Sequence, residues 1–385
     1  MSSESIYLDA NATTAQASAV TQAMIECYER FGANPASQHR PGHQARRRLE
    51  DAREAIAETL GAEIGGPQAD QLILTSGGTE ANNLAIFGLS GPPGSRTIVS
   101  SIEHPCVAGA AEQLSREDHR VDLLPVGRSG VIDPTELEKL LTDTAHLVSV
   151  MLANHETGAL QPLPEIAAIA HEHRALIHTD AVQAVGKIDI NFRELGVDAM
   201  TVTAHKCHGP LGIGALLLRN GVKLQPRLFG GSQQYGLRPG TENVALAVGM
   251  QTALELWRKE SQERTQRMQE LRDRFEALLL VEIEGLQVHS RSVARLPQTS
   301  NLAFPGVERQ AFFMALDMAG VACSTGSACQ SGSSEPSPTL LAMGCEKSQI
   351  DSSLRFSLGA TTEAAEVDEA ARRIILAYKH LRKAK

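Results

Sequence analysis

The sequence has no long apolar run and no leader-like beginning. Residues 1–5 lack both a basic segment and an apolar core. No later stretch approaches the roughly 20 apolar residues that a membrane-spanning helix needs. We therefore expect a cytoplasmic protein with no membrane partner.

Closely paired cysteines are also missing. The six cysteines are scattered and form no C-x-x-C pair: Cys27, Cys106, Cys207, Cys323, Cys329 and Cys345. In the cytoplasm such cysteines are reduced thiols and do not build a disulfide framework. We also expect no resident metal ion.

An excess of positive charge is absent. The chain has 36 lysines and arginines against 45 aspartates and glutamates, a net charge of −9. Nucleic-acid binding needs basic faces, and the one basic cluster, residues 379–385, is interpreted as a solvated helix end. We expect no direct contact with nucleic acid. The 385 residues, with 42% hydrophobic content, suit a globular protein of more than one domain.

Short apolar runs alternate with helical patterns through much of the chain. The runs that read as strands are 72–75, 97–100, 147–152 and 175–180. This alternation predicts an α/β fold with parallel strands and right-handed crossovers. Ligands of such sheets bind beyond the carboxyl ends of the strands. The polar residues that follow predicted strand ends should therefore converge: Thr79, His104, Asn154, Asp180 and Lys206.

A lysine lies between two histidines in the turn after the apolar run 197–202. A glycine-rich stretch and a second run, 215–218, follow Lys206, which predicts a buried strand, a tight turn and a returning strand. Such a lysine can form a Schiff base, whereas an isolated His-Lys pair is more often a surface hairpin. Asp180 ends another buried run, with Gln183 three residues later. These residues favour the first interpretation, because pyridoxal phosphate requires a lysine Schiff base and an aspartate for its pyridinium nitrogen.

Further residues suit the same cofactor, although each has a plainer interpretation. Gly77, Gly78 and Thr79 open a predicted helix and offer backbone N–H groups to a phosphate, but Gly-Gly-Thr is also a common loop. His104 either stacks on a cofactor ring or caps a strand. Arg355 lies within an apolar run, so it needs a partner, which is either a substrate carboxylate or a structural ion pair.

Cys329 lies in a stretch dense in serine and glycine, residues 324–337. A cysteine in such a loop is neither packed in a core nor held rigidly. That setting suits a nucleophile that must travel, and a chance exposed thiol is the alternative.

Together these motifs resemble the NifS/IscS-type cysteine desulfurases, within the class V aminotransferase group of fold-type I pyridoxal-phosphate enzymes. The matching motifs are residues 7–14, 34–37, 75–80, 103–104, 178–183, 204–206, 239–241, 326–329, 335–337 and 355–359. The resemblance implies a large domain, mostly a parallel sheet, that binds the cofactor. It would span 15–255. A smaller α+β domain would comprise 1–14 and 256–385 and carry a mobile catalytic loop at about 323–337.

The resemblance also implies an activity and a role for each matching residue. L-cysteine would become L-alanine, and its sulfur would pass to Cys329 as a persulfide for iron–sulfur cluster, thio-cofactor or tRNA biosynthesis. Lys206 would carry the cofactor and move protons, Asp180 would pair with the pyridinium nitrogen, and Gln183 would bond the ring hydroxyl. His104 would stack on the ring and assist proton transfer as a catalytic residue. Other implied cofactor contacts are Gly78, Thr79, His155, Thr203, His205 and, from the second subunit of a homodimer, Thr241. The implied substrate-carboxylate ligands are Asn34 and Arg355.

Three departures from the family pattern leave alternatives open. His155 replaces a usual asparagine, and its ordinary pKa of about 6.5 predicts a protonation coupled to the cofactor, unless the ring turns away. Cys323 places a second thiol near Cys329, which could also ligate an iron–sulfur cluster transiently. The short tail leaves the sulfur-acceptor protein unidentified. Selenocysteine lyase, aminotransferase and non-catalytic sulfur relay are the alternative functions.

Overall fold

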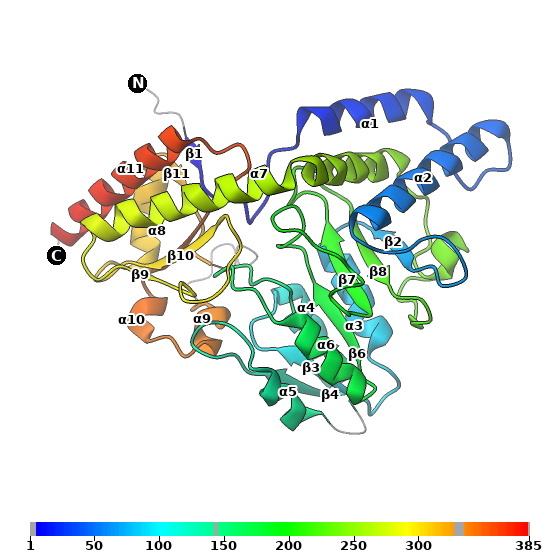
Figure 1. The fold of residues 1–385 in the computed structure, drawn as a ribbon, viewed down its shortest axis with the longest axis horizontal. Helices are drawn as coiled ribbons and strands as arrows, with labels where there is room; N and C mark the ends of the chain where they lie inside the picture. Colours follow the sequence, from blue (N-terminus) through cyan, green and yellow to red (C-terminus); the bar gives the residue numbers. More distant parts are fainter. Residues whose placement is uncertain (1–4, 142–144, 327–334, 384–385) are drawn as a thin grey trace.

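The computed structural model describes residues 5–141, 145–326 and 335–383, and the predicted nucleophile Cys329 lies outside them. A seven-stranded sheet of order β2-β8-β7-β6-β5-β3-β4 forms the centre (Figure 1). Its strands are β2 (Gln71–Thr75), β3 (Arg96–Ser100), β4 (Arg120–Leu124), β5 (Ala145–Ser149), β6 (Leu176–Asp180), β7 (Ala199–Thr203) and β8 (Gly214–Leu218).

The directions of the strands confirm the predicted α/β fold. β3, β4, β5, β6 and β7 run parallel to one another. β8 is antiparallel to both β7 and β2, so it is the returning strand predicted after Lys206. β7 and β8 are buried along their whole length, as expected for strands covered on both faces.

Alternate side chains of the sheet pack in two apolar clusters, one on each face. Ile73 and Leu216 pack in one cluster with α3 (Gly78–Leu89) and α4 (Pro105–Arg116). Leu72 and Leu217, their chain neighbours, point to the opposite cluster, because successive strand residues face opposite sides. That second cluster includes residues of α1 (Ser18–Arg30), α2 (Arg40–Thr59), α5 (Pro134–Leu140) and α6 (Leu163–Glu172).

A separate apolar core joins the two ends of the chain. Ile6 and Leu8 pack with residues from Leu271 to Tyr378. One of its sheets pairs β1 (Ile6–Tyr7) with β11 (Val321–Ala322). The other places β10 (Thr299–Ala303) between β12 (Ser353–Ser357) and β9 (Gln287–Val288). The remaining elements are η1 (Gln233–Gly236), α8 (Arg309–Met318), α9 (Pro338–Ala342), α10 (Lys347–Ile350) and α11 (Ala364–Lys383). Two cores agree with two domains, whose boundaries remain a prediction.

One long helix connects the two cores. α7 (Val244–Glu282) has 39 residues and is about 58 Å long at 1.5 Å per residue. Its early residues, such as Leu254, pack in the cluster of α1 and α2, and its later ones, such as Phe275, pack in the core of the chain ends. Within the described ranges, no helix has the length and apolar character to cross a membrane.

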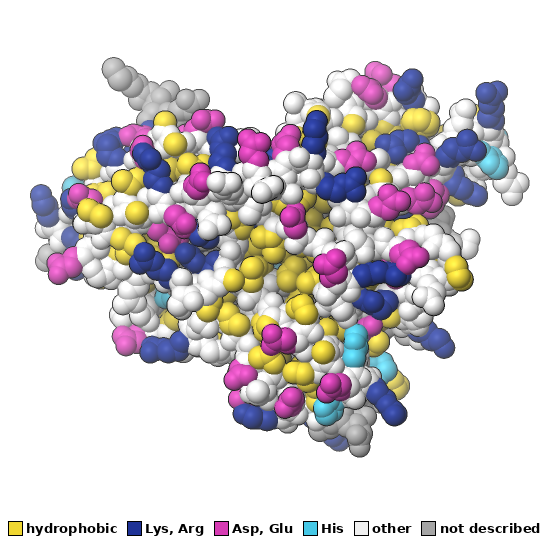
Figure 2. Space-filling model, in the orientation of Figure 1, with side chains coloured by type: hydrophobic (Ala, Val, Ile, Leu, Met, Phe, Trp, Pro, Cys, Tyr) yellow, Lys and Arg dark blue, Asp and Glu magenta, His cyan; other side chains and the backbone are white. Residues whose placement is uncertain are grey.

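The molecular surface mixes charges of both signs. Figure 2 shows lysine and arginine side chains interspersed with aspartate and glutamate over one face, with hydrophobic side chains toward its middle. Many of these charges pair on the same helix, for example Arg264 with Glu260 and Arg116 with Glu112.

Candidate active site

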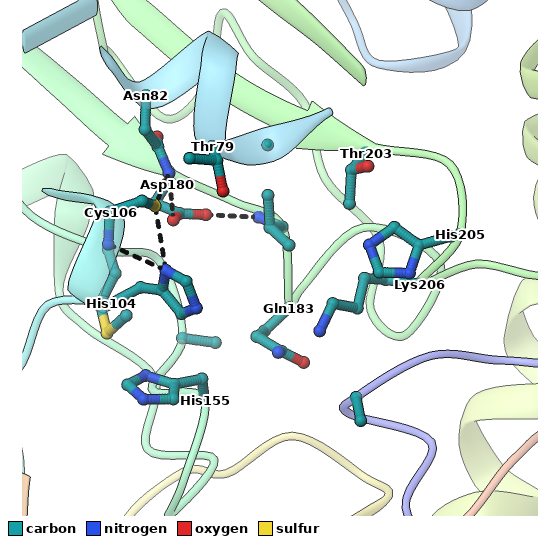
Figure 3. Close-up of a pocket in the computed structure, with 15 residues that line it drawn as sticks. Thr79, Asn82, His104, Cys106, His155, Asp180, Gln183, Thr203, His205 and Lys206 are labelled. Atoms are coloured by element: carbon teal, nitrogen blue, oxygen red, sulfur yellow. Dashed lines mark hydrogen bonds between the residues drawn. The ribbon is translucent and has the colours of Figure 1, made fainter. Parts of the chain in front are cut away.

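Four of the five side chains predicted to follow strand ends meet in one cavity of about 190 Å³ (Figure 3). They are Thr79, His104, Asp180 and Lys206. The fifth, Asn154, is buried outside the cavity lining, and its Oδ1 accepts backbone N–H groups of the following turn. The cavity lies at the carboxyl ends of the parallel strands, where the fold predicts a ligand.

Lys206 projects into the cavity from the tight turn between β7 and β8 (Figure 3). Its Nζ donates a hydrogen bond to the carbonyl oxygen of Asn11. Behind the turn, the buried Lys187 donates from Nζ to the carbonyl oxygen of Lys206. Burial lowers the pKa of Lys187 to about 8. The backbone of Lys206 is therefore held by Lys187, while its amine lies in the cavity.

Asp180, the last residue of β6, is fixed by two hydrogen bonds. Its Oδ1 accepts from the backbone N–H of Val182 at 2.9 Å, and its Oδ2 accepts from Nδ2 of Asn82 at 2.6 Å. Gln183 lines the same cavity and donates from Nε2 to the carbonyl oxygen of Asn11 at 3.1 Å. A buried carboxylate held in this way suits the protonated nitrogen of a ring.

Another part of the cavity offers hydrogen-bond donors to an anion. Gly78 and Thr79 line it at the first turn of α3, where backbone N–H groups lack helical partners. Thr203 and His205 line it from β7 and the turn that follows. Burial, followed by the charge of Lys206, lowers the pKa of His205 to about 4, so the ring is neutral at pH 7. It can contact an anion only as a neutral N–H donor.

Gly214, the first residue of β8, lets the strand approach the backbone of Gly77 at the start of α3. A Cβ on Gly214 would lie 2.7 Å from the carbonyl carbon and 2.9 Å from Cα of Gly77. Real side chains do not tolerate such contacts with backbone atoms. The strand that follows Lys206 therefore packs directly against the loop that opens α3.

His104 sits at the start of α4 as its N-cap. Its Nδ1 accepts from the backbone N–H of Cys106 at 3.2 Å, and Sγ of Cys106 lies 2.9 Å from the same nitrogen. Nδ2 of Asn82 is 3.1 Å from that sulfur. Burial is the main cause that lowers the pKa of His104. Contacts therefore run from Asp180 through Asn82 and Cys106 to His104 (Figure 3).

His155 lines the cavity with its ring edge-on to His104, at a centroid distance of 5.3 Å and an interplanar angle of 75°. Burial lowers the pKa of His155 well below its ordinary value, and the charges of His104, Arg355 and Lys206 add to this. The ring therefore stays neutral in the working range of pH. The lowered pKa disfavours the prediction that His155 titrates there together with the cofactor, and the sequence does not reveal the burial that causes it.

Arg355 lies on β12 with only 2% of its surface exposed. Its guanidinium donates to Oδ1 of Asp9 at 2.8 Å and to the carbonyl oxygen of His155 at 3.0 Å. Its buried Nε has no acceptor among the described residues. Arg355 thus forms a structural ion pair with Asp9, and its contact with a substrate carboxylate stays a prediction.

Other predicted residues lie away from this cavity. Asn34 is exposed, and its Oδ1 accepts from the backbone N–H of Ala36 at 2.9 Å. Thr241 is exposed too, and neither side chain contributes to the cavity lining. Cys323 is buried, and burial followed by the charge of Asp9 raises the pKa of its thiol above the ordinary range.

Sequence reasoning missed several residues of the cavity. Asn82 and Cys106 line it, and Asn11 lies outside the lining but accepts hydrogen bonds from Lys206 and Gln183 at its carbonyl oxygen. Asn82 follows Gly78 by four residues on α3, so helical spacing places both on one face. That spacing was a usable signal. Cys106 follows His104 by two residues, but only the structure brings its sulfur to the imidazole.

The donor set of the cavity fits pyridoxal phosphate. A lysine amine, a buried carboxylate and a helix N-terminus face one space, which the group's aldehyde, ring nitrogen and phosphate require.

Comparisons with known proteins agree with this geometry. The family model described as aminotransferase class-V matches residues 6–370. The cysteine desulfurase IscS of Dictyoglomus turgidum is 41% identical over 94% of this chain and 92% of its own length. A NifS-like protein from Rickettsia africae has a TM-score of 0.89 and 30% identity, covering 98% of this chain and all of its own. A protein described as SspA in complex with cysteine has a TM-score of 0.79 and 32% identity, covering 91% of this chain and 98% of its own. The predicted family is confirmed: the chain belongs to the class V aminotransferases and, within them, to the NifS/IscS-type cysteine desulfurases.

Proposed function

We propose that this protein uses pyridoxal phosphate to convert L-cysteine to L-alanine and transfers the sulfur to Cys329 as a persulfide. The observation that carries the proposal is the cavity shared by Lys206, the anchored Asp180 and the helix start at Gly78. The relatives named cysteine desulfurase and the similar protein described with cysteine support the choice of substrate.

The proposed cofactor contacts follow from the position of each side chain. When bound, pyridoxal phosphate withdraws electrons from the substrate's Cα. Asp180 is placed to hold a protonated ring nitrogen, and Asn82 keeps its carboxylate oriented. Gly78, with the other anion-facing groups described above, is placed for the phosphate.

Proton handling falls to residues beside the amine. Nζ of Lys206 donates to the carbonyl oxygen of Asn11, so the amine has a fixed position to which it can return. His104 lies at the edge of the same cavity, within reach of a bound substrate. Both side chains can therefore move protons at the substrate without crossing bulk water.

The sulfur transfer balances without an added oxidant. The substrate's Cβ–S bond breaks, and Cβ keeps the electron pair and gains a proton, which gives alanine. The sulfur forms an S–S bond with Cys329 and remains there as a persulfide. A sulfur-acceptor protein of unknown identity would then take it.

We also propose that the active unit is a homodimer in which Thr241 completes the partner's phosphate site. Thr241 is exposed in its own chain and lies outside the cavity lining. Large apolar side chains nearby in sequence are exposed as well: Leu228 (48%), Phe229 (85%) and Tyr235 (75%). Exposed apolar side chains of this size are suited to an isologous interface. A fully active monomer, measured by light scattering during turnover, would rule this out.

A pair of variants tests the division of labour. Lys206→Ala should lose the visible absorbance of the bound cofactor and all alanine formation. Cys329→Ser should keep the absorbance and bind L-cysteine, yet release no sulfide in the presence of a thiol reductant. Cys323→Ser is the matched control and should release sulfide normally, because the buried Cys323 thiol has a raised pKa. Normal sulfide release by Cys329→Ser would refute the nucleophile assignment. The same assay with L-selenocysteine tests the lyase alternative.

A further inference from the structure

The proposed function leaves one thiol of the cavity without a role. Cys106 lines the cavity, and its sulfur lies between two polar groups, Nδ2 of Asn82 at 3.1 Å and Nδ1 of His104 at 2.9 Å. Asn82 in turn holds Asp180. The sulfur of Cys106 thus connects Asp180, through Asn82, with His104 (Figure 3).

The hydrogens in this chain of contacts point away from Asn82, toward Asp180 on one side and toward Cys106 and His104 on the other. A carboxylate only accepts, so the group of Asn82 that faces Asp180 is its NH₂. One amide hydrogen goes to Asp180 and the other to the sulfur of Cys106. Nδ1 of His104 already accepts from the backbone N–H of Cys106, so it carries no hydrogen in the neutral ring. The S–H of Cys106 is therefore the donor toward Nδ1.

We propose that Cys106 is a positioning residue, whose thiol links Asn82 to His104 and holds the neutral imidazole with its hydrogen on Nε2. Figure 3 shows the ring edge away from Cys106 directed toward the cavity. The group that His104 presents there is then an N–H donor. A role as base at this edge would require the other tautomer. The role of His104 as a donor in the reaction rests on the proposed function, whereas the assignment of its tautomer does not.

Other charged or titratable groups also face the imidazole of His104. Asp180 favours the protonated ring, while Lys206 and Arg355 disfavour it, and His155 packs edge-on. These groups set how readily the ring gains a proton. The contacts of Nδ1 with Cys106 decide which nitrogen carries the hydrogen of the neutral form.

Nitrogen NMR of the cofactor-free full-length protein, labelled with ¹⁵N-histidine, tests this proposal. His104 is assigned by the signal lost in His104→Gln. Wild type should show a hydrogen-bearing Nε2 and a bare Nδ1. Cys106→Ala removes a donor that stabilises the neutral ring, so the pKa of His104 should rise, and its acid dissociation constant should fall about fivefold, the worth of one buried hydrogen bond. Cys106→Ser keeps a donor and should stay near wild type.

Cys345→Ala is the matched control. Cys345 is also half-buried beside a histidine, with its sulfur 3.8 Å from Nδ1 of His289, and its removal should leave His104 unchanged. A hydrogen on Nδ1 in wild type, or an unchanged His104 titration in Cys106→Ala, would overturn the proposal. An equal shift in Cys106→Ser and Cys106→Ala would do so too, because packing would then be the cause. No turnover is measured, so these outcomes are independent of the desulfurase assay.

Discussion

Replacing Glu103 by glutamine should remove a strong pH dependence from the stability of the fold. Glu103 precedes His104 and is buried, and its Oε1 accepts from Oγ of Ser100 at 2.6 Å and from the backbone N–H of Met151 at 2.7 Å. Its Oε2 has no partner within the described part of the chain. Burial raises the pKa of this carboxyl to about 8; the bond from Ser100 opposes the rise, and the charge of Asp180 adds to it.

The size and sign of the effect follow from these pKa values. The unfolded carboxyl titrates near 4.5 and the folded one near 8. Between them the folded state binds more protons, so stability is fully present below pH 4.5 and declines as pH rises toward 8. A difference of about 3.5 pH units at about 1.4 kcal/mol each corresponds to a loss of about 5 kcal/mol for Glu103. Glutamine has no such titration.

Urea unfolding of the full chain at several values between pH 5 and 8 measures this difference. The free energy of unfolding of Glu103→Gln should gain on that of wild type by several kcal/mol as pH rises across this range. Glu54→Gln, on the exposed face of α2, is the control and should follow the wild-type curve. Parallel curves for Glu103→Gln and wild type would refute the reasoning.

Three further variants test other parts of the site. Gly214→Ala puts a methyl group 2.7 Å from Gly77, so it should cost about 1–3 kcal/mol in urea unfolding and weaken binding of pyridoxal phosphate in a fluorescence titration; an unchanged protein would contradict the packing argument. His155→Asn should leave the pH titration of the cofactor's absorbance unchanged, because burial keeps His155 neutral, and a displaced curve would contradict this. Asp9→Asn removes the charged partner of Arg355 and should lower the free energy of unfolding by about 1.5–3 kcal/mol, whereas wild-type stability would show that the ion pair contributes nothing.

The sequence predicted what depends on local pattern. Apolar runs located the strands that lead to Lys206 and Asp180, because the burial of a strand is visible as a run of apolar residues in the sequence. Contacts between distant segments leave no such trace. The ion pair of Arg355 with Asp9 joins residues 346 positions apart, so only the fold decides between a structural and a substrate-binding arginine.

The contact between Cys106 and His104 could not be predicted from the sequence for a different reason. The two residues are close in sequence, but the direction of a side chain in a helix cap depends on backbone angles that composition does not specify. The neutral state of His155 is similar, since it results from burial by segments far away in the chain. Residue type and order could place these groups near the site but not assign their protonation.

The hydrogen bond from Lys206 to Asn11 has a consequence for the biosynthesis of the protein. Its carbonyl oxygen accepts from Lys206, and its backbone N–H donates to Oγ of Ser357, which is 346 residues later. A ribosome that adds 5–20 residues per second needs roughly 8–30 s to travel from Lys206 to Ser357. During that time the nascent chain contains Lys206 but not yet Ser357, the residue of β12 that binds the backbone of Asn11. The finished cavity, and therefore tight capture of the cofactor, must wait until translation is almost complete.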